Sequence, residues 1–168
     1  RIMKASKSPL HIIDFAITEF DFKLVELSST NEDLELGFVM SQYDIDIDFN
    51  IYSGDLIRVN IRAEINRCDK KLPGYSVFAE AVCLFNFDGS TQLPEDARNA
   101  LEGFSTIYIA LNSLRGLISN FTANAPFGRY ILPSIDLNDL IEKKKKALIN
   151  KENNKNQTSI NTSKKVLK

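Results

Sequence analysis

The sequence predicts an α+β fold, in which a four-stranded antiparallel sheet is followed by two helices packed on one face of the sheet. Apolar and polar residues alternate over residues 43–51, 57–65 and 75–87, the pattern of half-buried strands. Helical spacing of apolar residues begins only after Pro94. Strands followed by helices, rather than alternating with them, are typical of antiparallel α+β domains.

The first expected strand is less regular than the others. Phe15 and Ile17 keep one phase of the alternation, whereas Phe20 and Phe22 keep the other. One extra residue near Thr18 shifts the phase in this way, because a β-bulge places two residues opposite one. The sequence therefore predicts a strand with a bulge at its middle.

The next two strands are expected to form a hairpin. In residues 43–51 every odd position is apolar, and Ser53-Gly54-Asp55 supplies residues that favour a turn. A hairpin centred on Gly54 would place Asp46 opposite Arg62, an oppositely charged cross-strand pair on the solvent face.

The fourth strand, residues 75–87, carries apolar residues on both faces. Its odd positions include Cys83, which we expect in the core as a reduced thiol. Its even positions include Phe78, Val82 and Leu84. A strand that is apolar on both faces needs a second cover, so these three residues are predicted to form an oligomer interface.

Two helices are expected after the strands. Apolar residues recur at helical spacing between Phe104 and Phe121, which predicts a long amphipathic helix. Asp136 is a suitable N-cap for a second helix with Leu137, Leu140 and Ile141 on its apolar side.

The chain divides into three expected parts: a flexible N-terminus at residues 1–9, one domain at residues 10–149 and a disordered basic tail at residues 150–168. The total formal charge is −1, but residues 141–168 hold nine lysines and two glutamates, a net charge of +7. Lysines without interleaved arginine or aromatic residues indicate a solvated tail, and we expect no nucleic-acid partner. No apolar run has the length of a membrane helix, so no membrane insertion is expected.

The sequence contains few residues in patterns that are typical of catalytic or metal sites. The spacing of a calcium loop is present at Asp44, Asp46, Asp48 and Asn50, but Phe49 stands where such a loop needs glycine. These residues are better explained as the solvent-exposed face of a strand. His11 is the single histidine and has no ligand at metal spacing. We therefore expect no enzyme, no metal and no cofactor.

A long connection at residues 27–42 ends in apolar residues. Two interpretations are open: a loop that packs into the core, or the lining of a groove that takes extended apolar peptides. Methionine and phenylalanine give adaptable contacts in such grooves. The residues concerned are Leu34, Leu36, Phe38, Val39 and Met40.

One stretch, Ala125-Pro-Phe-Gly-Arg-Tyr-Ile-Leu-Pro-Ser-Ile-Asp-Leu-Asn-Asp-Leu-Ile141, resembles the SecB family of export chaperones and its SecB-like relatives. In that family a Phe-containing connection leads from the first helix through a Leu/Pro segment into the second helix. Phe127, Leu132, Asp136 and Leu140 stand in the corresponding places. The order of strands and helices also matches the family, over about residues 10–148.

The resemblance implies a homotetramer, a dimer of dimers, that holds non-native polypeptides without ATP. The family's client groove maps onto Leu34, Leu36, Phe38, Val39 and Met40 together with Leu137, Leu140 and Ile141. Acidic residues on the outer face of the sheet bind the family's motor ATPase, and Glu80 and Glu19 match such positions. Lys23 replaces an expected acid, a departure that weakens the case for motor binding.

We therefore expect an ATP-independent holdase in the cytoplasm, whose clients are unfolded preproteins or an antitoxin. The alternative is a domain that binds a small hydrophobic ligand between the sheet and the helices. Both functions need exposed apolar surface, because apolar burial is non-directional and tolerates unrelated ligands.

Overall fold

The computed structural model describes residues 2–26, 35–89 and 92–150. The chain forms two compact units, Arg1–Pro133 and Ser134–Lys168, and each is described by itself. The expected tail at residues 150–168, apart from Asn150, and the expected client residue Leu34 lie outside the described residues.

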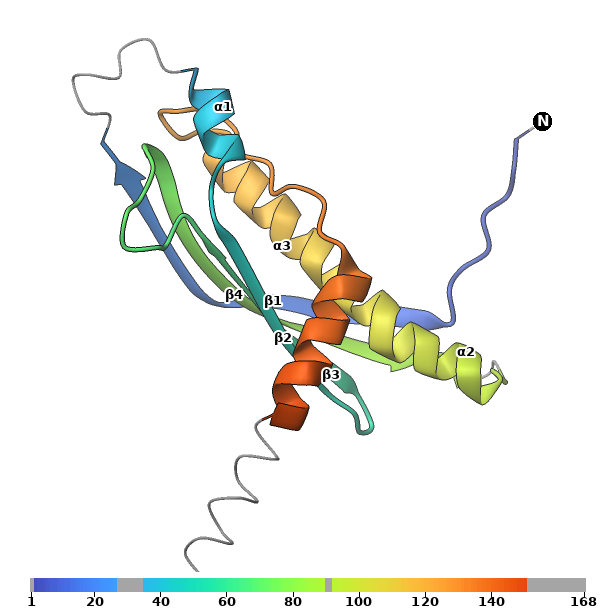
Figure 1. Ribbon diagram of the computed structural model, residues 1–168. Coiled ribbons are helices and arrows are strands. Elements are labelled where there is room, and N and C mark those ends of the chain that lie inside the picture. The colour runs from blue at the N-terminus through green and yellow to red at the C-terminus, as the bar shows by residue number, and fades with distance from the viewer. Residues whose placement is uncertain (1, 27–34, 90–91, 151–168) are drawn as a thin grey trace, which may run out of the picture. The chain divides into compact units, whose positions relative to one another are not determined.

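The first unit is a four-stranded antiparallel sheet with helices after it, as the sequence predicts (Figure 1). The strands lie in the order β1-β4-β3-β2, so β1 and β2 form the two edges. The bounds are β1 Leu10–Val25, α1 Leu36–Ser41, β2 Ile45–Tyr52, β3 Ile57–Ile65, β4 Gly74–Phe87, α2 Glu95–Ala100, the π-helical segment η1 Leu101–Ser105, and α3 Thr106–Thr122. In the second unit, residues 137–150 are helical, and the Asp136 carboxylate caps this helix by accepting the Asn138 amide at 3.0 Å.

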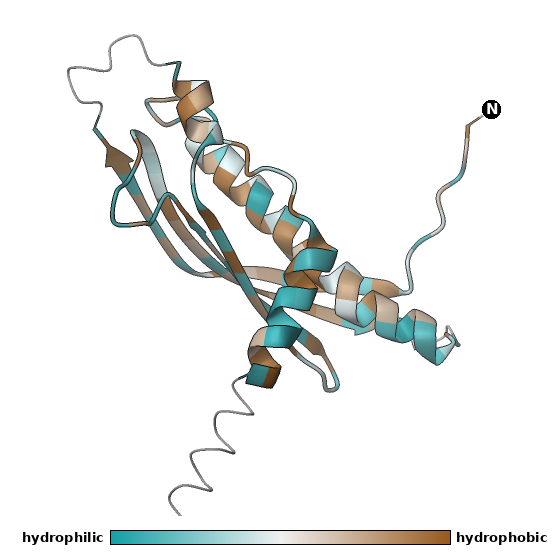
Figure 2. Cartoon of the chain, viewed as in Figure 1, coloured by the Kyte–Doolittle hydropathy of each residue, from teal (hydrophilic) through white to brown (hydrophobic). Residues whose placement is uncertain are grey.

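The core lies between α3 and the face of the sheet that carries the odd residues of β3 and β4. Figure 2 shows hydrophobic and hydrophilic residues alternating along the strands. The fully buried positions of the two central strands include Val59, Ala63, Tyr75, Val77 and Cys83. Each large apolar side chain buried in this way stabilises the fold by about 1.5–3 kcal/mol. The prediction that Cys83 is a core residue is confirmed.

The bulge in β1 is confirmed, and a second one is present. The register between β1 and β4 shifts between Ile17 and Glu19, which leaves Thr18 as the extra residue, and again between Ile12 and Asp14. Because each bulge adds a residue on one strand only, β1 changes phase and keeps its aromatic residues on the helix side. Phe20 and Phe22 each meet Phe121 of α3 at 4.8 Å between ring centroids.

The expected register of the hairpin was wrong by two residues. Asp46 lies opposite Glu64, and Arg62 lies opposite Asp48. The hairpin is therefore centred on Asp55 and not on Gly54. The connection has Gly54, Asp55 and Leu56 as bends, a longer turn than the tight one that a sequence centred on glycine suggests.

The short helix α1 was not predicted. Its six residues, Leu36–Ser41, have no side-chain N-cap hydrogen bond. A helix this short is marginal by itself and depends on tertiary packing. Burial of Val39 and Met40 supplies that packing.

Candidate functional site

A pocket of about 330 Å³ opens beside α1 in the first unit. Most of its lining is apolar, and the one charged side chain among the described lining residues is Arg129. The lining comes from α1, the first residue of β2 and the segment that follows α3: Gly37, Met40, Ser41, Ile45, Arg129, Tyr130, Ile131 and Pro133. An apolar cavity with few polar groups is the usual form of a ligand site.

The Tyr75 hydroxyl holds the start of one pocket wall, residues 127–133. It accepts the Phe127 amide at 2.9 Å and donates to the Gly128 carbonyl at 2.8 Å. Tyr75 itself lies in β4 and is fully buried. Burial raises the pKa of this phenol, so it stays protonated and keeps its donor.

Two side chains of α3 hold the rest of the wall. The Thr122 hydroxyl accepts the Tyr130 amide at 2.9 Å. The Arg115 guanidinium donates to the Leu132 and Pro133 carbonyls, both at 2.9 Å. A segment without strand or helix pairing therefore has its backbone groups satisfied by side chains, which fixes its conformation.

The wall alternates between inward and outward side chains. Tyr130 and Leu132 are buried, and Tyr130 is only 4% exposed. Ile131 is 62% exposed, and Arg129 is exposed as well. This alternation of burial is that of an extended segment, whose successive side chains point to opposite sides, so Arg129, Ile131 and Pro133 share the exposed side of the wall. All three line the pocket, as does Tyr130 from the buried side.

Tyr130 is the buried anchor of this wall. Its ring centroid lies 5.5 Å from that of Tyr43, and burial raises its pKa. Its hydroxyl has no hydrogen-bond partner among the described residues. The ring supplies apolar area between the sheet and the wall, which explains its place beside Met40.

The predicted client residues of the long connection divide between surface and interior. Phe38 is 64% exposed and Leu36 is half-buried, whereas Val39 and Met40 are buried. Met40 lines the pocket. Val39 and Met40 therefore pack inward as the core interpretation predicts, and Phe38 lies on the outer side of the short helix.

The other predicted client residues, Leu137, Leu140 and Ile141, lie in the helix of the second unit at residues 137–150. Four residues of the pocket were not predicted as client residues from the sequence: Ile45, Arg129, Ile131 and Pro133. The run from Arg129 to Pro133 holds three consecutive apolar residues and no polar–apolar alternation, so its pattern did not identify the wall. It is five residues long, ends in a proline and follows Pro126 closely, which is typical of a connection.

The face of the sheet opposite α3 is strongly acidic. Glu19 of β1 lies opposite Glu80 of β4, and Asp46 of β2 lies opposite Glu64 of β3. The Thr18 hydroxyl donates to Glu80 at 3.3 Å, and Arg62 lies 3.6 Å from Glu64. Like charges on directly opposite residues destabilise a sheet. The two acidic pairs on this face therefore do not contribute to the pairing of the strands.

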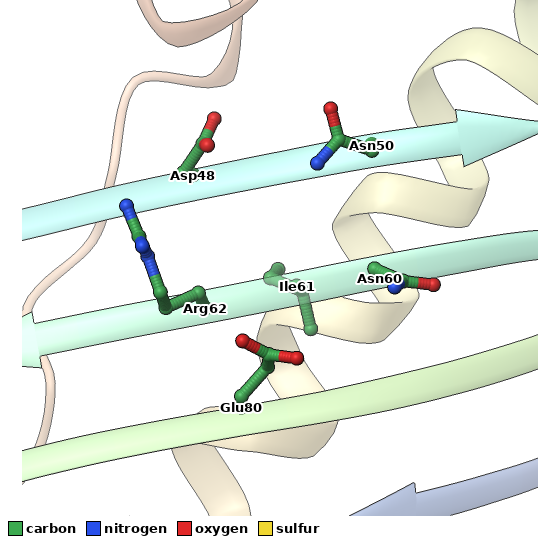
Figure 3. A pocket seen from close by; sticks show the side chains of 6 residues that line it. All are labelled: Asp48, Asn50, Asn60, Ile61, Arg62 and Glu80. Carbon is green, nitrogen blue, oxygen red and sulfur yellow. The ribbon is translucent and has the colours of Figure 1, made fainter. Parts of the chain in front are cut away.

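A shallow polar hollow of about 90 Å³ lies on this acidic face. Figure 3 shows Asp48 and Asn50 on β2, Arg62 extending from β3 toward β2, and Glu80 on β4. Asn60 also lines the hollow, and its side-chain oxygen has no hydrogen-bond partner among the described residues. The hollow suits small polar groups and has no apolar floor comparable to the pocket beside α1.

The structure brings the predicted motor-binding and oligomer residues together on this same face. Phe78, Glu80, Val82 and Leu84 are alternate residues of β4, and all four are half-buried. Glu19 lies next to Glu80 on β1. A partner that covers Val82 must therefore also cover Glu80.

Neighbouring side chains already shield part of this face. The Arg67 guanidinium lies 5.5 Å from the Phe78 ring centroid and donates to Asp21 at 2.6 Å. The hydrogen bond from Arg67, and to a smaller extent the one from Lys23, holds the pKa of Asp21 below its usual value. Lys23, the departure from the family's acidic pattern, is thus paired with Asp21 at 3.2 Å.

Among the described residues, no group of three histidine, cysteine or acidic side chains is placed to hold a metal ion. Asp46 and Asp48, from the calcium-like spacing, lie in β2. No helix in the described part of the chain is long and apolar enough to cross a membrane.

The fold is that of a solved SecB-like chaperone. The chain is similar to the Mycobacterium tuberculosis Rv1957 SecB-like chaperone in complex with a ChAD peptide from the Rv1956 HigA1 antitoxin, with a TM-score of 0.52 and 11% sequence identity, over 76% of this chain and 91% of that one. At this identity the likeness concerns the fold.

A protein of unknown function from Streptococcus agalactiae aligns with a TM-score of 0.43 and 8% identity, over 74% of this chain and 97% of that one. No protein-family profile matches the sequence. No curated protein matches it either.

Proposed function

We propose that this protein is an ATP-independent chaperone, a holdase that binds unfolded or aggregation-prone polypeptides. The observation that carries the proposal is the apolar pocket beside α1, whose wall is fixed by Tyr75, Thr122 and Arg115. A wall that is ordered before a client arrives lowers the entropic cost of binding. The fold similarity to a SecB-like chaperone supports the same function.

The position of the pocket beside an edge strand supports binding of an extended chain. Ile45 lines it and is also the first residue of β2, which is an edge strand. An edge strand has unpaired backbone groups that can pair with an incoming strand, while alternate side chains of that strand enter a neighbouring pocket. Backbone pairing does not depend on the client's sequence, and apolar burial at about 25 cal/mol per Å² depends on it only weakly.

We propose that the clients are unfolded preproteins or an antitoxin and that the protein acts in the cytoplasm. Rv1957, the similar chaperone, is described in complex with an antitoxin peptide. The exposed Phe38 and the apolar residues Leu137, Leu140 and Ile141 are further candidate client contacts. Phe38 offers exposed apolar area to an unfolded segment, whereas Leu140 and Ile141 are half-buried and Leu137 is buried.

The test is suppression of aggregation. A denatured test protein is diluted into buffer with the chaperone at stoichiometric ratios, with and without ATP, and light scattering is followed. We expect suppression that ATP does not change, and a weaker effect for Ile131→Ser. Leu56→Ser is the matched control, because Leu56 is exposed in the connection between β2 and β3 and does not line the pocket. Equal scattering with and without the chaperone would end the proposal.

We also propose a homotetramer, a dimer of dimers, which requires two different surfaces on each chain. One is the free edge of β1, sixteen residues long, beside the exposed Ile12, Ile17 and Leu24. The other is the outer stripe of Phe78, Val82 and Leu84.

Use of the outer stripe competes with binding of the export motor ATPase at Glu19 and Glu80, because these residues share one face. Sedimentation mass separates the two uses. If Val82→Glu lowers the mass to that of a dimer, the stripe is an oligomer interface and the motor is excluded from it. If the mass is unchanged, the face is free for a basic partner, and Glu80→Lys is expected to weaken motor binding.

The alternative function, binding of a small hydrophobic ligand, is favoured by one observation. The pocket volume of about 330 Å³ falls within the range of roughly 300–1,000 Å³ for small-molecule sites. Native mass spectrometry distinguishes the two functions. A small molecule that co-purifies with the chain supports a ligand carrier, and a mass gain only with unfolded polypeptide supports the holdase.

A further inference from the structure

Arg129 is the charged residue of the pocket, and it is unpaired. Its side chain is exposed at the lining, and it makes no hydrogen bond or ion pair with any described residue. The other five described arginines all have a nearby partner. Arg62 and Arg67 pair with carboxylates, Arg58 and Arg98 lie over aromatic rings, and Arg115 donates to backbone carbonyls of the wall. A guanidinium presents a planar fork of donors that matches a carboxylate.

The fixed wall sets the distance from this charge to an apolar contact. Arg129 and Ile131 are alternate residues of an extended segment, so their backbones are separated by about 7 Å, twice the rise per residue of a strand. Hydrogen bonds to Phe127, Tyr130 and Leu132 hold the segment on both sides of this pair. The spacing is therefore a property of the folded chain before any client binds.

An extended client has the same spacing between its own alternate residues. A client segment lying along the wall places every second side chain toward it. When one of these side chains is apolar and meets Ile131, Met40 and Ile45, the next one along meets Arg129. No carboxylate lines the pocket among the described residues, so nothing there offsets the positive charge.

We propose that the pocket selects client segments in which an acidic residue stands two positions from an apolar residue, with Arg129 binding the carboxylate. This selectivity rests on the proposed peptide-binding function and adds a specificity residue to it. The acidic residues Glu19, Asp46, Glu64 and Glu80 lie on the outer face of the sheet and repel such clients, which favours their binding on the pocket side.

Three synthetic peptides test the proposal. They are identical twelve-residue extended sequences that differ at one position, two residues from a leucine, which is glutamate, glutamine or lysine. Binding is measured by fluorescence anisotropy. An exposed ion pair gives a modest effect, so we expect the wild-type protein to bind the glutamate peptide roughly fivefold tighter than the glutamine peptide. The preference is expected to shrink at 1 M salt, where charges are screened.

The variants assign the preference to one side chain. Arg129→Gln should bind the glutamate and glutamine peptides equally, and Arg129→Glu should prefer the lysine peptide. Arg58→Gln is the matched control, because Arg58 is an exposed arginine of β3 that lies over Tyr52 and not in the pocket. It should keep the wild-type preference.

The outcomes separate this inference from the proposed function. If no peptide binds, the holdase proposal fails. If the wild-type protein binds all three peptides equally, the pocket binds clients but the acid selectivity is wrong. If Arg129→Gln weakens all three peptides by the same factor, Arg129 contributes only the packing of its aliphatic stem, and the selectivity is again refuted.

Discussion

Glu19 and Glu80 are directly opposite each other on the antiparallel strands β1 and β4, on the face of the sheet that α3 does not cover. Thr18, the bulged residue of β1, donates a hydrogen bond to Glu80 at 3.3 Å. The bulge thus places Glu19 opposite Glu80, since in a regular strand Thr18 would occupy that position.

Replacing Glu19 with glutamine should stabilise the protein. The change removes a like-charge cross-strand pair, and such pairs contribute roughly 0.2–1 kcal/mol. Urea unfolding at low salt measures the gain, which should diminish at high salt. Glu26→Gln, just beyond the end of β1, is the control and should change the unfolding free energy less. A destabilised Glu19→Gln variant would show that the repulsion between Glu19 and Glu80 does not lower the unfolding free energy.

Gly74→Ala should destabilise the protein strongly. Gly74 has a φ of +111°, and an added Cβ would clash with the Tyr43 hydroxyl. That hydroxyl donates to Pro73 and accepts the Tyr75 amide, both at 2.8 Å. Backbone strain and the displaced hydroxyl together should cost about 2–4 kcal/mol in urea unfolding.

Gly116→Ala provides the matched comparison for Gly74→Ala. Gly116 lies in α3, and an added Cβ there meets nothing within 4 Å. Alanine in a helix interior is favoured over glycine by roughly 0.5–1 kcal/mol, so this variant should be more stable than the wild type. Two destabilised variants would mean that the Tyr43 contact is not what makes Gly74 necessary.

Tyr75→Phe should loosen the pocket wall without removing core volume. It deletes the hydroxyl that contacts the Phe127 amide and the Gly128 carbonyl, and it leaves both groups without that partner. The expected loss is about 1–3 kcal/mol of stability. Hydrogen exchange at the Phe127 amide should accelerate and peptide affinity should fall. Unchanged exchange would show that Tyr75 does not order the wall.

Stability should decline above about pH 9. Burial raises the pKa of the Cys83 thiol from 9.0 to about 11. Because the unfolded chain loses this proton at lower pH than the folded chain, rising pH favours unfolding between the two pKa values. A shift of this size corresponds to a loss on the order of 2 kcal/mol by pH 11.

The alkaline loss can be assigned with a variant and a thiol reagent. Cys83→Ala should show a smaller decline in stability between pH 9 and pH 11 than the wild type. In the folded protein, a thiol reagent should label the exposed Cys68 and leave Cys83 unmodified until denaturant is added. Rapid labelling of both thiols would contradict the burial of Cys83.

The strands, their inner faces and the phase shift in β1 were predictable from the sequence. Alternation in β3 and β4 identifies buried positions such as Val59 and Val77, because a strand points successive side chains to opposite faces. The register of β2 on β3 was not predictable in the same way. A shift by two residues keeps every apolar residue on the same face, so the pattern fits both registers equally.

The sequence by itself determined the order of strands and helices, the buried face of each central strand and the N-cap at Asp136, because these depend on neighbours in the chain. Only the tertiary structure decided that Met40, Ile45 and Arg129 line one pocket. Met40 and Ile45 lie far from Arg129 in the sequence. The wall that carries Arg129 is fixed by hydrogen bonds from the buried Tyr75 and Thr122 and from the half-buried Arg115, and no local pattern in the sequence predicts these bonds.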